Sequence, residues 1–112
     1  MEGKKTIEPD IQPILSSLKE ELIDFYQNRL LQLTLFGSQA RGEAIPGSDI
    51  DVLVILKSPV DAGTEIKHTS KIISDLSLHH NVVISFLFMD ENHYKTRNGT
   101  LLRNIRREGI LL

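Results

Sequence analysis

Residues 31–56 read LQLTLFGSQARGEAIPGSDIDVLVIL, and this stretch holds two strand-like segments separated by a glycine-containing connection. Leu31 to Phe36 alternate with period two and stop at Gly37, which predicts a strand entering a tight turn. Ile50 to Leu56 form a nearly continuous run of β-branched and aliphatic residues, as expected of a strand buried on both faces. The stretch therefore predicts two strands of a sheet.

The connection between these strands contains its own local structure. Ser38 to Gly42 are expected to form a short helix, and a loop follows over residues 43–48. Pro46 and Gly47 mark a turn within that loop, because both residues favour turn conformations. The chain thus leaves one strand through a helical turn and enters the next through a loop.

A helix is expected before the first strand, with Asp10 as its cap and Pro13 in the tolerated first turn. Its apolar stripe has helical spacing, which predicts one face packed on the sheet. The residues of this stripe are Ile11, Ile14, Leu15, Leu18, Leu22 and Phe25.

A second helix is expected after the second strand, over Ala62 to Leu78, with Asp61 placed to cap it. Val82 to Phe88 then predict a third strand of the buried kind. The inward stripe of the helix is predicted to consist of Ile66, Thr69, Ile72, Ile73 and Leu76.

The last part of the chain begins with a polar connection, residues 90–99, which ends in the turn signal Asn98-Gly99. Leu101 to Arg107 are expected to be helical, and Gly109 is a natural helix stop. The apolar tail, residues 110–112, either covers the edge of the sheet or docks on a partner; the sequence leaves both open.

This order of elements predicts an α/β (α+β) fold with a short mixed central sheet of three or more strands and helices packed against it. A length of 112 residues corresponds to about one domain. We interpret residues 1–9 as a loose N-terminal lead-in, because they are polar and contain Gly3 and Pro9, and residues 10–112 as a single domain.

Composition excludes several classes of function. The chain has 13 Lys and Arg against 15 Asp and Glu, a net charge of −2, so it is not a generally basic nucleic-acid coat. It has no Cys, which excludes disulfide scaffolds, thiolate zinc sites and cysteine nucleophiles. No apolar run approaches the ~20 residues of a membrane span, and the N-terminal residues lack a signal-peptide core. We therefore expect a soluble, cytoplasmic domain that does not bind membranes.

The residues that indicate a chemical function are a glycine turn and two nearby carboxylates. Gly37 lacks a Cβ, so another group can approach its backbone, and Ser38 opens a helical turn whose hydroxyl and N–H groups suit an anion such as a triphosphate. Asp49 and Asp51 lie two apart at the entry to a strand, so both face one side. Such a pair repels unless a proton or cation lies between, and Mg²⁺ suits it. This combination is typical of nucleotidyl or phosphoryl transfer.

These residues resemble the nucleotidyltransferases of the DNA polymerase β type. Their motif is Gly-Ser, ten residues, then Asp-x-Asp, and Gly37-Ser38, residues 39–48 and Asp49-Ile50-Asp51 match it without a gap. The residues Ala40-Arg41-Gly42 resemble those found at this place in the minimal nucleotidyltransferase (MNT) branch of the family. The likeness extends from about residue 18 onward, and its specific part is residues 36–54.

The resemblance implies a function and a set of site residues. Members of the MNT branch commonly act as antitoxins of helical HEPN ribonuclease toxins, so this chain would transfer AMP from ATP to a tyrosine hydroxyl of its toxin. Gly37, Ser38, Asp49 and Asp51 would be catalytic, with one or two Mg²⁺ ions on Asp49 and Asp51 and the triphosphate on Gly37 and Ser38.

Two further nucleotide-binding candidates each have an alternative reading. Arg41 either reaches the β- or γ-phosphate or is a solvated helix residue, and Ser48 either contacts the nucleotide or only orders the loop before Asp49. Adenine is implied by the resemblance alone, because no residue of the sequence identifies the base.

The sequence departs from the family pattern at one place. Polymerase-β-type enzymes usually carry a third carboxylate on a following central strand, and Asn81 to Phe88 contain none. Ser85 or Val83 occupies the usual place, and Asp90 follows at the far end. This departure keeps open an antitoxin that only covers its toxin. A second alternative, a stand-alone transferase acting on a small molecule or RNA, shares the motif.

Other polar groups have ordinary interpretations. Arg103, Arg106 and Arg107 lie on one side of the last predicted helix and form either a solvated face or a basic patch. The patch lacks stacking aromatic residues, so direct nucleic-acid binding is not expected. His68, His79 and His80 lack the spacing of a zinc site.

Overall fold

The computed structural model describes residues 7–112, which form a four-stranded mixed sheet with helices on both faces. The elements, in chain order, are α1 (Gln12–Tyr26), η1 (Gln27–Arg29), β1 (Leu30–Phe36), α2 (Ser38–Arg41), β2 (Ile50–Leu56), α3 (Ala62–His80), β3 (Ile84–Asp90), α4 (Glu91–Thr96), α5 (Thr100–Glu108) and β4 (Ile110–Leu111). The expected α/β fold class, with a short mixed sheet, is confirmed.

The strands lie in the order β3-β2-β1-β4, and their directions bring three strand ends together. β1 pairs antiparallel with β2 and β4, whereas β2 and β3 are parallel. The register places Phe36 opposite Asp51 and Ser85 on the other side of Asp51. The end of β1 and the beginnings of β2 and β3 therefore lie at the same end of the sheet.

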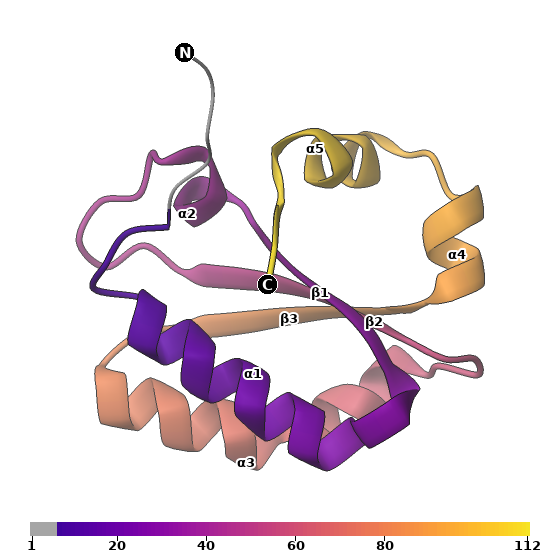
Figure 1. The fold of residues 1–112 in the computed structure, drawn as a ribbon, viewed down its shortest axis with the longest axis horizontal. Helices are drawn as coiled ribbons and strands as arrows, with labels where there is room; N and C mark the ends of the chain where they lie inside the picture. Colours follow the sequence, from indigo (N-terminus) through magenta and orange to yellow (C-terminus); the bar gives the residue numbers. More distant parts are fainter. Residues whose placement is uncertain (1–6) are drawn as a thin grey trace.

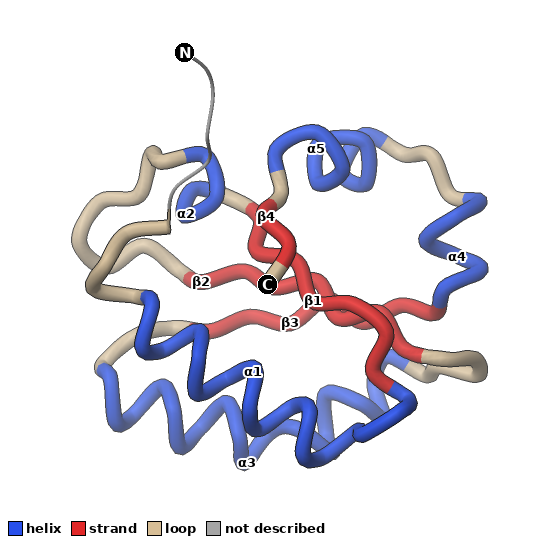
Figure 2. The backbone as a smooth tube through the Cα atoms, viewed as in Figure 1, coloured by secondary structure: helices blue, strands red, loops and turns tan. Residues whose placement is uncertain are grey.

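Helices α1 and α3 cover one face of the sheet, α4 and α5 lie on the other side, and α2 lies at the end of the sheet where β1 ends (Figures 1 and 2). Beneath α1 and α3 lies the larger core, which alternate residues of the three longer strands share with the two helices. It includes Leu18, Leu22, Leu35, Ile50, Val52, Val54, Leu56, Phe86 and Phe88.

The opposite face is only partly covered. There Leu53 and Ile55 of β2 pack against Leu102 and Ile105 of α5, with partly buried residues of β1, β3 and α4 around them. Because side chains alternate along a strand, Asp51 belongs to this same face, one period before Leu53. Asp51 therefore lies on the face that α5 partly covers.

Most predicted elements are confirmed, including both strands of the motif, the short helix after Gly37 and the turn at Pro46 and Gly47. Asp61 caps α3 as expected, since its Oδ1 accepts a hydrogen bond from the N–H of Thr64 at 3.1 Å. The apolar tail covers the sheet edge: Ile110 and Leu111 form β4 beside β1. Of the predicted lead-in, residues 1–6 lie outside the described residues, and residues 7–9 form neither helix nor strand.

The predicted cap and stripe of the first helix need correction. Asp10 lies in a turn before α1, and Ile11 occupies the cap position without a side-chain hydrogen bond. Pro13, inside the first turn, has no N–H for Asp10 to satisfy. Phe25 is 49% exposed, and its neighbour Tyr26 is buried instead. Tyr26 points inward because its hydroxyl donates a hydrogen bond to Glu65, 2.8 Å away.

The buried face of α3 also differs from the predicted apolar stripe at the start of the helix, again because of the hydrogen bond between Tyr26 and Glu65. Ile66 is 50% exposed, whereas Glu65 is buried. The carboxylate of Glu65 accepts the hydrogen bond from Tyr26 and forms an ion pair with Arg29 at 2.9 Å. Two polar partners in the interface thus turn a charged residue inward and leave the isoleucine outside.

The third strand and the connection after it also differ from expectation. β3 runs over Ile84–Asp90 rather than from Val82 to Phe88, and its burial alternates, because it lies at the edge of the sheet and α5 covers only part of one face. Residues 91–96, predicted as polar connection, form α4, which Asp90 caps. Among the described residues, no helix combines the length and apolar character needed to cross a membrane.

Gly109 provides a test of how α5 and β4 are joined. A Cβ at Gly109 would lie 2.5 Å from the carbonyl oxygen of Ile105 and 2.6 Å from Cγ2 of Thr34. Gly109→Ala is therefore expected to lower the free energy of unfolding by about 1–3 kcal/mol, measured by urea denaturation. Gly99→Ala is the control, since a Cβ there has no atom within 4 Å. Equal stability of the two variants would contradict this packing.

Candidate active site

Gly37 and Asp51 form the centre of the candidate site. Gly37 ends β1 with φ +76°, in the region that favours glycine, and a Cβ at this position would lie 2.5 Å from Oδ2 of Asp51. The close approach follows from the register, in which Phe36, the residue before Gly37, lies opposite Asp51. The missing side chain of Gly37 therefore provides the space that the Asp51 carboxylate occupies.

The turn after Gly37 is closed by its own backbone. The carbonyl oxygen of Gly37 accepts hydrogen bonds from the N–H groups of Ala40 and Arg41, both at 3.1 Å. Gly42 ends α2 in the left-handed region, with φ +74°. Ser38 is half-buried at the start of this turn, next to the Gly37–Asp51 contact.

The electrostatics of the aspartate pair indicate strain. Burial raises the pKa of Asp51 above its ordinary value, the nearby Asp49 carboxylate raises this pKa further, and the guanidinium of Arg41 lowers it. Asp49 itself is exposed. The like charge of Asp49, which lies just before β2, acts on Asp51, as expected for carboxylates two residues apart in the chain. A cation between them would relieve both effects.

Arg41 and Ser48 lie near the pair, but both side chains have protein partners. Arg41 Nε donates to Glu43 Oε1 at 2.8 Å, and its guanidinium is exposed. Ser48 Oγ accepts a hydrogen bond from the N–H of Ile45 at 2.9 Å, and the N–H of Ser48 donates to the carbonyl oxygen of Ile45 at 2.9 Å. Ser48 thus orders the loop before Asp49.

Gln39 helps to position the loop before Asp49, a role that the sequence did not predict. Its side chain is buried, and Nε2 donates to the carbonyl oxygen of Ser48 at 3.4 Å, which connects α2 to the loop before Asp49. A polar residue in a four-residue helix carries no periodic signal, so its burial emerges only from the tertiary structure.

The position for a further acid is occupied by Ser85, which lies beside Asp51 in the β2–β3 register. Asp90 lies at the other end of β3, opposite Leu56. Its carboxylate accepts a hydrogen bond from the N–H of His93 at 2.8 Å and contacts His93 Nδ1 at 2.6 Å, and these contacts lower the pKa of Asp90. Asp90 therefore serves α4 and is not close to the aspartate pair.

Several of the remaining polar residues have contacts of their own. The guanidinium of Arg106 lies over the ring of Tyr94 and donates to the carbonyl oxygen of Arg97 at 3.0 Å, so it connects α4 and α5. His79 and His80 contact each other edge to face. Residues 7–112 contain no group of three or more His, Cys, Asp or Glu side chains arranged to hold a metal.

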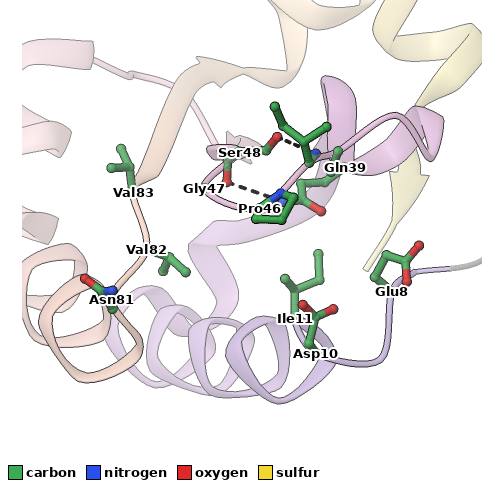
Figure 3. Close-up of a pocket in the computed structure, with 12 residues that line it drawn as sticks. Glu8, Asp10, Ile11, Gln39, Pro46, Gly47, Ser48, Asn81, Val82 and Val83 are labelled. Atoms are coloured by element: carbon green, nitrogen blue, oxygen red, sulfur yellow. Dashed lines mark hydrogen bonds between the residues drawn. The ribbon is translucent and has the colours of Figure 1, made fainter.

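A cavity of about 520 Å³ adjoins the loop before Asp49 (Figure 3). The inner side of the loop, Gln39, the start of α1 and the link between α3 and β3 form its wall. Glu8 and Asp10 contribute carboxylates, and no Lys or Arg lines it among the described residues. The cavity therefore does not suit phosphate groups, which the Gly37–Arg41 side fits better.

Comparisons with known proteins agree with these features. The family model described as "Nucleotidyltransferase domain" matches residues 15–111. The chain is 28% identical over 106 residues to "Putative protein adenylyltransferase MJ0604" of Methanocaldococcus jannaschii, covering 94% of this chain and 96% of that protein. A second protein of that organism, "Putative protein adenylyltransferase MJ0141", is 33% identical over 76 residues, which are 68% of this chain and 76% of the relative.

Solved structures share the fold. A toxin–antitoxin structure with AMP-PNP has a TM-score of 0.59 at 17% identity, over 84% of this chain and 68% of that chain. A Sulfolobus solfataricus protein described as a "putative nucleotidyltransferase" has a TM-score of 0.59 at 22% identity, over 97% and 90% of the chains. A Shewanella oneidensis complex of a tri-AMPylated HEPN toxin with its MNT antitoxin has a TM-score of 0.53 at 14% identity, over 88% and 70%.

The Gly37–Asp51 contact predicts different costs at two glycines. Gly37→Ala places a methyl group against the Asp51 carboxylate, whereas Gly42→Ala, also at positive φ, has no atom within 4 Å. Backbone strain alone costs about 1–2 kcal/mol, so Gly37→Ala should lose more stability than Gly42→Ala in urea denaturation. It should also shift the ¹³C carboxyl resonance of Asp51, which Gly42→Ala should leave in place. An unmoved resonance in Gly37→Ala would contradict the contact.

The raised pKa of Asp51 gives a pH-dependent prediction. A folded-state pKa above the unfolded value means that ionised Asp51 lowers stability at neutral pH, and this cost fades as the pH falls through the folded pKa. Asp51→Asn should therefore be more stable than the native chain at pH 7, and the difference should shrink on acidification. NMR titration should show a lower pKa for Asp51 in Asp49→Asn. Asp24→Asn, on the exposed side of α1, controls for net charge.

Proposed function

The chain belongs to the nucleotidyltransferase domain family, and from this premise we propose that it is an antitoxin that transfers AMP from ATP to a tyrosine hydroxyl of a HEPN-type ribonuclease toxin in the cytoplasm. The observation that carries the proposal is the contact of Gly37 with Asp51, which unites both halves of the sequence motif at one end of the sheet. Residues 10–112 would act as a single domain.

The donor set fits magnesium. Carboxylate oxygens are preferred ligands of Mg²⁺, which takes a few of them and completes its shell with phosphate oxygens and water. The raised pKa of Asp51 beside Asp49 marks a pair that gains from a cation. Asp49 and Asp51 would hold one or two Mg²⁺ ions. Bound there, Mg²⁺ supplies charge neutralisation at the α-phosphate and the leaving pyrophosphate.

The other residues of the site orient the nucleotide. Gly37 leaves the backbone open beside Asp51, and Ser38 offers its hydroxyl at the turn where the triphosphate would lie. Arg41, whose charge already acts on Asp51, would exchange its exposed partner Glu43 for a phosphate. Exposed ion pairs contribute little energy, so this exchange costs little.

The transfer of AMP needs ATP and the tyrosine hydroxyl as its only reactants. The tyrosine oxygen forms a bond to the α-phosphorus, the bond from that phosphorus to the bridging oxygen breaks, and pyrophosphate leaves. The hydroxyl proton passes to solvent or to a base of the acceptor protein. AMP on a tyrosine near the RNA-cleaving site would silence the toxin.

Two findings support the nature of the acceptor. The curated relatives bear the name protein adenylyltransferase, and chains of the same fold occur in toxin–antitoxin complexes, one of them with an AMPylated HEPN toxin. A polypeptide acceptor also suits the site, because the sheet face beside Asp51 is open and Ser85 on it is exposed.

Intact-mass spectrometry of a candidate HEPN toxin, incubated with this chain, ATP and Mg²⁺, tests the proposal. The toxin should gain mass in AMP units. Asp49→Asn and Asp51→Asn should each slow the gain by about a hundredfold or more, whereas Asp24→Asn, on the other side of the sheet, should not. Omission of Mg²⁺ should also stop the transfer.

Two outcomes would overturn the mechanism. Transfer at the native rate by both aspartate variants would remove Asp49 and Asp51 from the reaction. A toxin that is bound and silenced without any mass gain would make the chain a steric antitoxin, and transfer to a small molecule or RNA without a partner would identify a different acceptor.

A further inference from the structure

β3 is an edge strand without the devices that usually protect an edge. It runs for seven residues, Ile84–Asp90, at one side of the sheet. From Val82 to Met89 the chain has no charge, proline or glycine, whereas soluble proteins commonly place lysine, proline or a bulge on such strands. The opposite edge is β4, which is only two residues long and therefore offers little to a partner.

The main-chain groups that face outward can be assigned. The carbonyl oxygen of Val83 accepts a hydrogen bond from the N–H of Ile50, so Val83 turns its backbone toward β2. Because this direction alternates along a strand, Ser85, Leu87 and Met89 do the same, and Ile84, Phe86 and Phe88 turn their N–H and carbonyl groups to the open side. Within residues 7–112, β3 pairs with β2 alone.

The edge lies next to the candidate active site. Ser85 is beside Asp51 in the register and is exposed, while Leu87 and Met89, further along β3, pack under α5. Helix α5 therefore leaves the β3 side of this face uncovered at Ser85, the residue in register with Asp51. On β3 the residue in register with Asp51 is Ser85, which has a small side chain, and Val83, two residues before it, is 58% exposed.

A strand added beyond β3 would lie in reach of the aspartate pair. Neighbouring strands are about 5 Å apart, so the added strand would run about 10 Å from β2. A tyrosine on it, pointing to the α5 side, covers most of that span, and an α-phosphate held at Asp49 and Asp51 covers the rest. The uncharged edge suits a polypeptide backbone, because it has no cation to hold a phosphate chain.

We propose that the edge of β3 is the docking site for an extended segment of the acceptor polypeptide, which pairs with Ile84, Phe86 and Phe88 and carries its tyrosine hydroxyl over Ser85 to Asp51. The proposal rests on the proposed function, in which the acceptor is a tyrosine of a HEPN toxin. It adds how that acceptor is held: the main chain supplies the binding, and Ser85 leaves the approach open.

Hydrogen exchange of the chain alone and in complex with the HEPN toxin tests this docking. In the free chain the amides of Ile84, Phe86 and Phe88 should exchange faster than those of Ser85, Leu87 and Met89, which bond to β2. In the complex the first three should slow by at least about tenfold, as for newly paired strands. A complex that forms without this protection overturns the docking, and so does equal protection in a homodimer without the toxin.

A matched pair of variants tests the route over Ser85. Ser85→Leu fills the space beside Asp51 and should reduce AMP transfer to the toxin by about tenfold or more, while the complex and its amide protection persist. Ser70→Leu, the same change on the exposed side of α3, should leave transfer unchanged. Undiminished transfer by Ser85→Leu would contradict the route.

The two proposals fail in different ways. Mass gain of the toxin without amide protection on β3 would retain the transferase and remove the docking edge. Amide protection on β3 without mass gain would retain the docking edge and reduce the protein to a steric antitoxin. If the chain forms no complex with the HEPN toxin, both proposals are wrong.

Discussion

The pairing of β1 with β2 is the constraint on which the site depends. It places the last residue of β1 opposite Asp51, so that Gly37, one residue further, lies directly against the carboxylate. A shift of one residue in this register would turn Asp51 into the core beneath α1 and α3, where a carboxylate is costly. The apolar side chains of β2, buried on both faces, therefore fix the position of a polar group at the end of the strand.

Two acids of the molecule show what this position costs. Glu65 is buried, and its carboxylate is satisfied by Arg29 and Tyr26. Asp51 is partly buried beside another carboxylate, its pKa is raised, and within residues 7–112 it forms no ion pair shorter than 4 Å. Glu65 thus contributes to the α1–α3 interface, whereas Asp51 lowers stability at neutral pH. Strain of this kind is typical of a functional group rather than a structural one.

The sequence predicted the elements that local pattern determines. The strand from Ile50 to Leu56 and the turn after Gly37 were expected from a continuous apolar run and a glycine, and both were found. Helical spacing placed Phe25 and Ile66 in the core, but their neighbours Tyr26 and Glu65 are buried instead. Tyr26 and Glu65 are hydrogen-bonded to each other across 39 positions of the chain, a contact that local spacing does not reveal. Helix α4 has no apolar stripe, and it exists because Asp90 caps it. The motif located the candidate site, but the burial of Gln39 depends on the loop that it contacts.

Incomplete coverage of one sheet face connects the fold with the proposed chemistry. The face under α1 and α3 supplies most of the core, so the other face can remain open at one end without loss of the fold. A helix that also covered the β3 side of this face would bury Ser85 and add apolar contact, yet it would close the approach to Asp51. The same holds for β3: a lysine on its edge would prevent unwanted pairing and would equally prevent an acceptor chain from pairing. The open edge of β3 and the Asp51 carboxylate at the same end of the sheet are two costs of different kinds, because an acceptor segment would pair the edge and a cation would neutralise the carboxylate.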